Sequence, residues 1–255
     1  MKNVVVITHP RSSSTFFMKQ FLNSKLFLCD KDVHHELISP WNRNSTRTYL
    51  GLPTVSNMSK NPYWDDDKKF VETFIQQHLD TGVAFKCLTH NHSYGFFEYL
   101  KTNDDIIKIT MNRKDKASQI ASLLVKLSTV DPGSNSFLYP AKQDNITFSM
   151  VRTKVQAGKI MSSLDKDGKL NRFIESLYWG SCVKHERIQN LMDSDYHYDI
   201  EDFHTSWGDQ SLEKELNFKF DFSKYLTPSH YSEIFSDWKD YEKFLRDALG
   251  PIDGL

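Results

Sequence analysis

Four hydroxyl side chains follow an arginine near the start of the chain, in the stretch ITHPRSSSTFFMKQFL that covers residues 7–22. They are Ser12, Ser13, Ser14 and Thr15, behind Arg11. An apolar run before them predicts a strand at Val4–Thr8, and an amphipathic run after them predicts a helix over about 14–25. A turn from a strand into a helix offers backbone N–H groups and the positive end of the helix dipole, an arrangement that binds phosphate or sulfate.

The residue types in this stretch suit an oxyanion. Hydroxyl groups donate hydrogen bonds, and an arginine adds a fixed charge with a forked donor. The stretch is not a Walker A loop, because neither GxxxxGKS nor GxxxxGKT occurs in the chain. The alternative is that the hydroxyl groups only cap the following helix, as Ser and Thr often do.

A second segment, TMNRKDKASQIAS at 110–122, repeats the order of strand, turn and helix. Arg113 follows a predicted strand at 106–111, and Ser122 stands nine residues later on a helix predicted from about Asp115. Ser118 precedes Ser122 by one helical turn on the same face. Arg113 and Ser122 could clamp a second phosphate. The alternative is a surface arginine and a small residue that eases helix packing.

The elements that position these residues predict an α/β fold. The β-branched run at Val4–Thr8 is typical of a strand buried on both faces of a parallel sheet. A further strand is predicted at 83–88, and long amphipathic helices are predicted over 169–192 and 229–249. Two strand–turn–helix units in one chain favour a central parallel sheet covered by helices.

The length and composition predict one globular domain over 1–255. The chain has 255 residues, of which 39% are hydrophobic and 25% charged, as in a packed protein rather than a disordered one. Polar stretches rich in proline and asparagine predict loop insertions near 40–68 and 131–150.

The charge and the cysteines exclude several classes of protein. A net charge of −1 does not favour broad binding to nucleic acid, so any anion site must be local. The three cysteines are far apart and have no CxxC spacing, which indicates neither a disulfide framework nor a zinc cluster. His34 and His35 are adjacent and lack a metal-ligand spacing, so no metal is expected. We find no membrane span and no signal-peptide core, and we expect a cytoplasmic protein.

Taken together, the two anion segments resemble the sulfotransferase superfamily, most closely its bacterial trehalose sulfotransferase-like branch. Pro10–Thr15 is similar to that family's 5′-phosphosulfate loop, PRSGST or PKSGTT, with Ser13 where the family has glycine. Arg113, Asp115, Gln119 and Ser122 are similar to the branch's RxDxxxQxxS motif. HHELISP, GVAFKCLTHNH and YDIEDF resemble further segments of the family in the same order. The basic RKG motif of cytosolic sulfotransferases is not found.

The resemblance implies a fold, a donor and roles for these residues. The fold would be a single-domain, P-loop NTPase-like, three-layer α/β/α arrangement with a central parallel sheet. The donor would be 3′-phosphoadenosine-5′-phosphosulfate (PAPS), and the product 3′,5′-adenosine bisphosphate (PAP). Arg11 would be catalytic by stabilising the charge on the leaving phosphate, and Ser12–Thr15 would hold the rest of the phosphosulfate. Arg113 and Ser122 would hold the 3′-phosphate. The acceptor would be a hydroxyl of a small molecule or carbohydrate, and no metal is required in principle.

Two residues are candidates for the base that takes the acceptor's proton. Glu36 lies in the HHELISP segment, which resembles the branch in which a glutamate stands near the acceptor. His90 follows a predicted strand end, where α/β sheets expose site residues, and a histidine titrates near neutral pH. The choice between Glu36 and His90 stays open, as does the oligomeric state.

Two other functions compete with sulfotransfer. One is a P-loop-like kinase or nucleotide-binding protein, which would need a lysine in the loop and a magnesium-holding aspartate at a strand end. The strand at 106–111 leads into Asn112 instead. The other is a non-catalytic binding protein that keeps the fold and one anion site.

Overall fold

A computed structural model describes residues 2–10, 12, 14–24, 27–28, 64–77, 82–129, 146–157, 169–201, 211–221 and 231–250. The chain divides into two compact units. We call Met1–Asn112 with Val183–Thr227 the sheet unit, and Arg113–Cys182 with Pro228–Leu255 the helical unit. Each unit is described by itself, and the prediction of a single domain stays a prediction.

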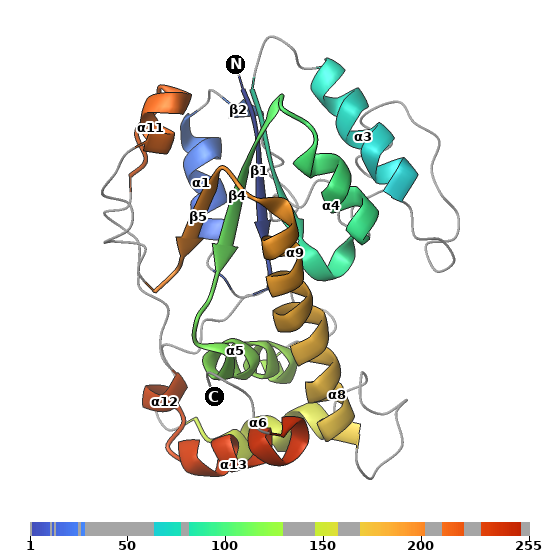
Figure 1. Cartoon of the computed structure of the whole chain (residues 1–255). Coiled ribbons are helices and arrows are strands. Elements are labelled where there is room, and N and C mark those ends of the chain that lie inside the picture. The colour runs from blue at the N-terminus through green and yellow to red at the C-terminus, as the bar shows by residue number, and fades with distance from the viewer. Residues whose placement is uncertain are drawn as a thin grey trace. The chain divides into compact units, whose positions relative to one another are not determined.

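The sheet unit is built on a parallel sheet with the strand order β2-β3-β1-β4-β5 (Figure 1). Its strands are β1 (Asn3–Thr8), β2 (Phe27–Leu28), β3 (Gly82–Leu88), β4 (Ile106–Asn112) and β5 (Tyr196–Asp199). Every strand pair is parallel, and all six residues of β1 are buried. The predicted α/β fold with a central parallel sheet is confirmed.

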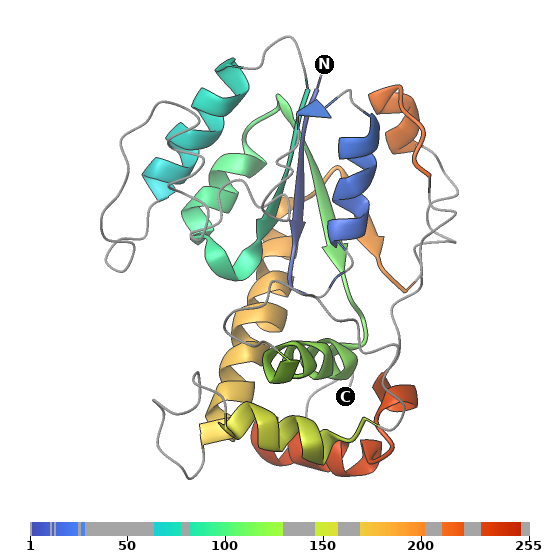
Figure 2. The ribbon, with the colours of Figure 1, turned by 180° about the vertical axis from the view of Figure 1, so that it is seen from behind.

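Helices cover both faces of this sheet. In Figures 1 and 2, α1 (Ser14–Ser24) and α11 (Ser211–Leu216) lie on one side of the strands. The opposite side carries α3 (Trp64–Gln77), α4 (Tyr94–Lys101) and α9 (Lys184–Met192). The core follows the alternation of the strands: Val4 and Val6 pack on the α1 side, and Val5 and Ile7 on the α4 side.

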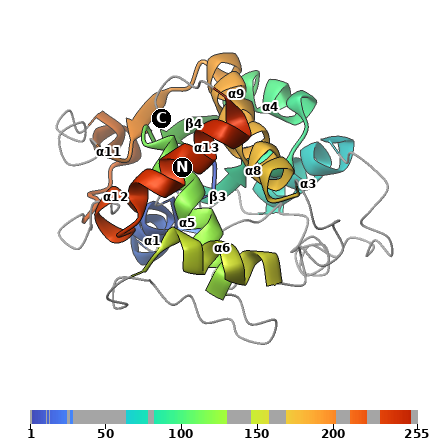
Figure 3. The ribbon, with the colours of Figure 1, turned by 90° about the horizontal axis from the view of Figure 1, so that it is seen from below.

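The helical unit contains α5 (Lys116–Thr129), α6 (Phe148–Ala157), α8 (Lys169–Tyr178), α12 (Tyr231–Ile234) and α13 (Trp238–Leu249), seen from below in Figure 3. Tyr241 of α13 is fully buried in the core of the helical unit. The Tyr241 hydroxyl donates to the Ala117 carbonyl at 2.8 Å. The carboxylate of Asp237 accepts from the N–H groups of Phe148 and Ser149 at 2.6 and 3.1 Å. The side chain of the residue before α13 therefore caps the start of α6.

Two predicted helices differ from the structure. The helix predicted over 169–192 is continuous, but its middle, Trp179–Val183, is a π-helix. The helix predicted over 229–249 breaks between α12 and α13, where Asp237 has φ −108° and ψ 39°. At this break the Asp237 carboxylate accepts from the N–H groups of α6. Helical periodicity in the sequence does not reveal such a contact.

The predicted bounds of the two loops extend too far toward the C-terminus. Residues 64–68 belong to α3 and residues 148–150 belong to α6, so the predicted loops 40–68 and 131–150 are wrong at these ends. Both segments place apolar residues at helical spacing just after the polar stretch. The rest of each loop, apart from Ile146 and Thr147, lies outside the described residues. No helix in the described part of the chain is long and apolar enough to cross a membrane.

A polar cluster joins the chain start, the edge strand and α11. Glu215 of α11 accepts hydrogen bonds from the Lys2 ammonium and from the Tyr196 hydroxyl of β5. These bonds hold the pKa of Glu215 below its usual value, and the bond to Glu215 raises the pKa of Lys2. Burial, followed by the bond to Glu215, raises the pKa of Tyr196 to about 12.

Replacing Glu215 tests this cluster. Because the folded pKa of Glu215 is lowered, its ionised form stabilises the fold above the usual value of 4.5, and this contribution is lost as the pH falls further. Glu215→Gln should lower the thermal unfolding midpoint at pH 7 by a few °C at most and flatten its decline below about pH 4.5.

Thermal unfolding from pH 7 to pH 3 measures both effects. Glu98→Gln, an exposed carboxyl on α4, is the control and should behave as the unmodified protein. Equal acid sensitivity of Glu215→Gln and the unmodified protein would contradict the role of this cluster.

Candidate functional site

The carboxyl ends of β1 and β3 mark a point where the chain leaves the sheet in two directions. β1 leads into α1 on one face, while its neighbour β3 leads into a short 3₁₀ helix, η1 (Thr89–Asn91), and then α4 on the other face. In open α/β sheets, ligands bind at such a divergence, outside the carboxyl ends of the strands. The sheet topology therefore points to the residues that follow β1 and β3.

The first turn of α1 offers donors without a competing carboxylate. Ser14 begins the helix and is buried, Thr15 is half-buried, and the first turn contains no acidic residue. The first N–H groups of a helix have no partner within the helix, and the dipole adds positive charge there. This end of α1 is therefore suited to an anion.

A buried lysine contributes to the same place. Lys86 lies in β3 beside Val6 of β1, on the face that α1 covers, and is only 3% exposed. Its ammonium donates to the Thr15 hydroxyl at 3.5 Å. We call the first turn of α1, the Thr15 hydroxyl and the Lys86 ammonium the α1 anion site. A buried ammonium beside the N-terminus of a helix adds its charge to that of the helix dipole, so positive charge is concentrated at one point.

The sequence analysis missed Lys86, although a signal was present. In GVAFKCL, an alternation of period two puts Ala84, Lys86 and Leu88 on one face of the strand. A lysine inside an otherwise apolar, doubly buried strand is unusual enough to suggest a local function. What the pattern could not supply is the neighbour of Lys86, which depends on the parallel register with β1.

The predicted residues of the first segment are only partly described. Ser12, Ser14 and Thr15 all lie between the end of β1 and the first turn of α1. The Ser12 hydroxyl is fully buried and forms a hydrogen bond with the Thr8 hydroxyl at the end of β1. Arg11 and Ser13 lie outside the described residues, so their roles stay predictions.

Of the two candidate bases, only His90 is described. It lies in η1 directly beyond β3, as expected, and is exposed. Glu36 lies outside the described residues. Beside His90, the Thr89 hydroxyl is fully buried and has no hydrogen-bond partner in the described part of the chain. A buried hydroxyl without a partner is costly, which makes Thr89 a further candidate for contact with a ligand or water.

Basic side chains near η1 are held by the protein itself. The ammonium of Lys184, at the start of α9, donates to the His92 carbonyl at 2.7 Å, and burial lowers its pKa. His9 is fully buried, and its ring packs edge-on against that of His185, with centroids 4.6 Å apart. Nδ1 of His9 donates to the Pro10 carbonyl at 3.0 Å, because a carbonyl can only accept, and this fixes the tautomer of the ring.

Arg113 and Ser122 of the second predicted segment lie in the helical unit. Arg113 and Ser122 are both buried, which disfavours the alternative of a surface arginine. Asp115 caps α5 by accepting from the Ser118 N–H at 2.8 Å, and the Ser118 hydroxyl accepts from the Tyr231 N–H at 2.9 Å. Ser118 is therefore structural, and the predicted phosphate clamp by Arg113 and Ser122 stays a prediction.

In the described segments, no group of three or more histidine, cysteine, aspartate or glutamate side chains could hold a metal ion. Comparison with known proteins finds no matching family model, no matching curated protein and no matching solved structure. Function is therefore inferred from the residues and their geometry.

The α1 anion site can be tested without assuming a function. Lys86→Met keeps most of the side-chain volume and removes the charge, so affinity for inorganic pyrophosphate should fall at least about tenfold, as expected when a charge-assisted contact is lost. Calorimetric titration of pyrophosphate measures this effect.

Lys108→Met is a matched control. Lys108 is also buried, but it lies on β4 beside Val5 of β1. It therefore points to the face of the sheet opposite to that of Lys86. Its replacement should leave pyrophosphate affinity unchanged. If Lys86→Met binds pyrophosphate as tightly as the unmodified protein, the ammonium is no part of an anion site.

Proposed function

We propose that the protein is a PAPS-dependent sulfotransferase that moves the sulfuryl group to a hydroxyl of a small-molecule or carbohydrate acceptor. The observation that carries the proposal is the Lys86 ammonium beside Thr15 at the first turn of α1. This turn belongs to the segment that resembles the family's phosphosulfate loop, and the donor's phosphosulfate carries the charge that the turn is suited to bind. We also propose the finer P-loop-like, three-layer fold and the cytoplasmic location.

The chemistry assigns a task to each group. The sulfur–oxygen bond to the 5′-phosphate breaks, its electron pair stays on the phosphate, and the acceptor oxygen bonds to sulfur as it loses its proton. Lys86 and the N–H groups of α1 would stabilise the charge that grows on the phosphate, with Arg11 beside them by the resemblance. Arg113 and Ser122 would hold the 3′-phosphate, and Glu36 or His90 would take the proton.

One observation favours a second candidate, a P-loop-like kinase or nucleotide-binding protein without sulfotransfer. Lys86 supplies an ammonium at the loop from a neighbouring strand, although the loop itself has no lysine. Asp199 ends β5 and supplies a carboxylate at a strand end, where it accepts from the Asn112 side chain at 3.2 Å. Both groups that a kinase needs are therefore available from other strands.

Calorimetry separates the two candidates. A sulfotransferase should bind PAP in the micromolar range without metal and at least about a hundredfold more tightly than ATP with magnesium, since the 3′-phosphate adds a charged contact. Transfer of ³⁵S from labelled PAPS to a panel of hydroxyl acceptors then tests catalysis. Tighter binding of ATP with magnesium than of PAP would refute the sulfotransferase and favour the kinase.

Three variants separate an enzyme from a binding protein. Arg113→Ala should lose PAP binding and turnover together, because its guanidinium is assigned to the 3′-phosphate. Glu36→Ala should keep PAP binding and lose turnover if Glu36 is the base, and His90→Ala should do so if the base is His90. PAP binding without sulfuryl transfer to any acceptor on the panel would favour a non-catalytic binding protein.

A further inference from the structure

The last residue of β1, Thr8, has its hydroxyl at the centre of a buried hydrogen-bond chain. Thr8 and Ser12 are both fully buried, and their hydroxyl groups are hydrogen-bonded to each other. The second contact of the Thr8 hydroxyl is to the carbonyl oxygen of Met111 in β4, at 3.3 Å. The His9 carbonyl lies at 3.4 Å from the same oxygen.

The donors in this chain follow from the groups present. A threonine hydroxyl has one proton to donate and can accept two hydrogen bonds, whereas a carbonyl oxygen can only accept. Either hydroxyl can donate in the Thr8–Ser12 bond; when the Thr8 proton goes to the Met111 carbonyl, the closer of the two, the Ser12 hydroxyl donates to Thr8. In this arrangement the Ser12 hydroxyl donates within the protein. The Ser12 side chain therefore supports the hydrogen-bond chain rather than donating to a ligand.

The hydrogen-bond chain through Thr8 connects two parts of the sheet unit, the entry to α1 and the carboxyl end of β4. The proposed function uses both. Ser12 stands two residues before Ser14, the first residue of α1, so a bond on Ser12 restrains the start of the helix that forms the α1 anion site. Met111 lies in β4, two residues before Arg113 in the chain. One hydroxyl thus ties the entry to α1 to the carboxyl end of the neighbouring strand.

We propose that Thr8 is a positioning residue of the α1 anion site. It does not touch the ligand but holds Ser12, and through Ser12 the first turn of α1, in the arrangement that binds an anion. The inference rests on the proposed function insofar as the bound anion is taken to be the 5′ end of the donor nucleotide. A preorganised turn binds more tightly because less ordering remains to be done on binding.

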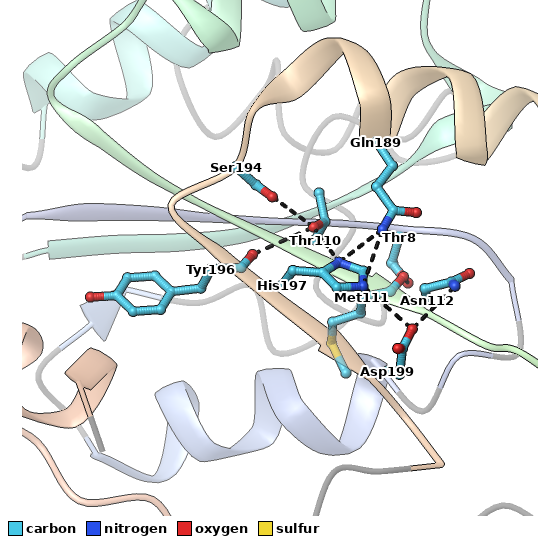
Figure 4. Close-up of polar contacts among 9 residues, drawn as sticks. All are labelled: Thr8, Thr110, Met111, Asn112, Gln189, Ser194, Tyr196, His197 and Asp199. Carbon is cyan, nitrogen blue, oxygen red and sulfur yellow. Dashed lines mark hydrogen bonds and ion pairs between the residues drawn. The ribbon is translucent and has the colours of Figure 1, made fainter. Parts of the chain in front are cut away.

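A second buried threonine offers a matched control. Thr110 in β4 is also fully buried, and its hydroxyl bonds to Nδ1 of His197 at 2.9 Å and to the Ser194 hydroxyl at 2.8 Å (Figure 4). These partners lie at the β5 edge of the sheet, away from α1. Replacement of either threonine by valine removes one buried hydroxyl at nearly constant volume.

The experiment compares PAP affinity with stability in Thr8→Val, Thr8→Ser and Thr110→Val, by calorimetry and thermal unfolding. We expect Thr8→Val to bind PAP about fivefold to tenfold more weakly, the factor that one lost hydrogen bond produces. Thr8→Ser keeps the hydroxyl and should bind within about twofold of the unmodified protein. Thr110→Val should lower the unfolding midpoint about as much as Thr8→Val does, yet leave PAP affinity unchanged.

A double-mutant cycle covers the case in which Thr8→Val does not fold well. Ser12→Ala removes the other end of the same bond, so it should weaken PAP binding by a similar factor. Where Thr8→Val folds, the double variant should be no weaker than the weaker single variant, because both changes remove one interaction. Unchanged PAP binding in Ser12→Ala, or losses that multiply in the double variant, would overturn the inference.

The outcomes separate this inference from the proposed function. If the unmodified protein binds PAP and Thr8→Val binds it equally well, Thr8 has no positioning role, and the sulfotransferase proposal is unaffected. If the protein binds ATP with magnesium instead of PAP, and Thr8→Val weakens that binding, the positioning role holds while the sulfotransferase proposal fails. Binding of neither nucleotide overturns both.

Discussion

The parallel pairing of β1 with β3 and β4 is the constraint on which the candidate site depends. Its register sets Val6 beside Lys86 and Thr8 beside Leu88. Lys86 of β3 therefore lies on the face that α1 covers and contacts Thr15 in the first turn of α1. A slip of one residue would turn Lys86 to the opposite face of the sheet and remove it from Thr15. Burial of β1 on both faces makes such a slip costly. The apolar side chains of the strands therefore hold the polar site in place.

The first segment of the site combines two kinds of polar group with different tasks. The N–H groups of α1 and the Lys86 ammonium supply positive charge, whereas Thr8 and Ser12 use their hydroxyl groups on one another and on the backbone. A row of hydroxyl residues in the sequence thus divides into those that shape the turn and those that begin the helix. This division explains why so many hydroxyl residues stand together without all of them facing a ligand.

Much of the fold could be predicted from the sequence, because β-branched runs and helical stripes are local signals. The strand at Val4–Thr8 and the helices after it and after Asp115 agree with the structure. β5, with the sequence YHYD, was missed because a short strand at the sheet edge is polar and depends on β4 for its pairing. Lys86 was missed as part of the site because its contact with Thr15 depends on the pairing of β3 with β1, and Thr8 was missed because one of its contacts is to Met111 of β4. Arg11 and Glu36 lie outside the described residues, so their predicted roles are untested.

The cap on α6 has a consequence for how the chain folds during synthesis. Phe148 depends on Asp237, which is 89 residues later, and each compact unit is assembled from two separate stretches of the chain. A ribosome would release α5 and α6 well before α13 exists to cover their apolar sides, and β4 well before β5. Neither unit can close from one continuous stretch of nascent chain. Contacts of such long range slow folding and leave apolar surface exposed in the meantime, which favours protection of the growing chain by chaperones.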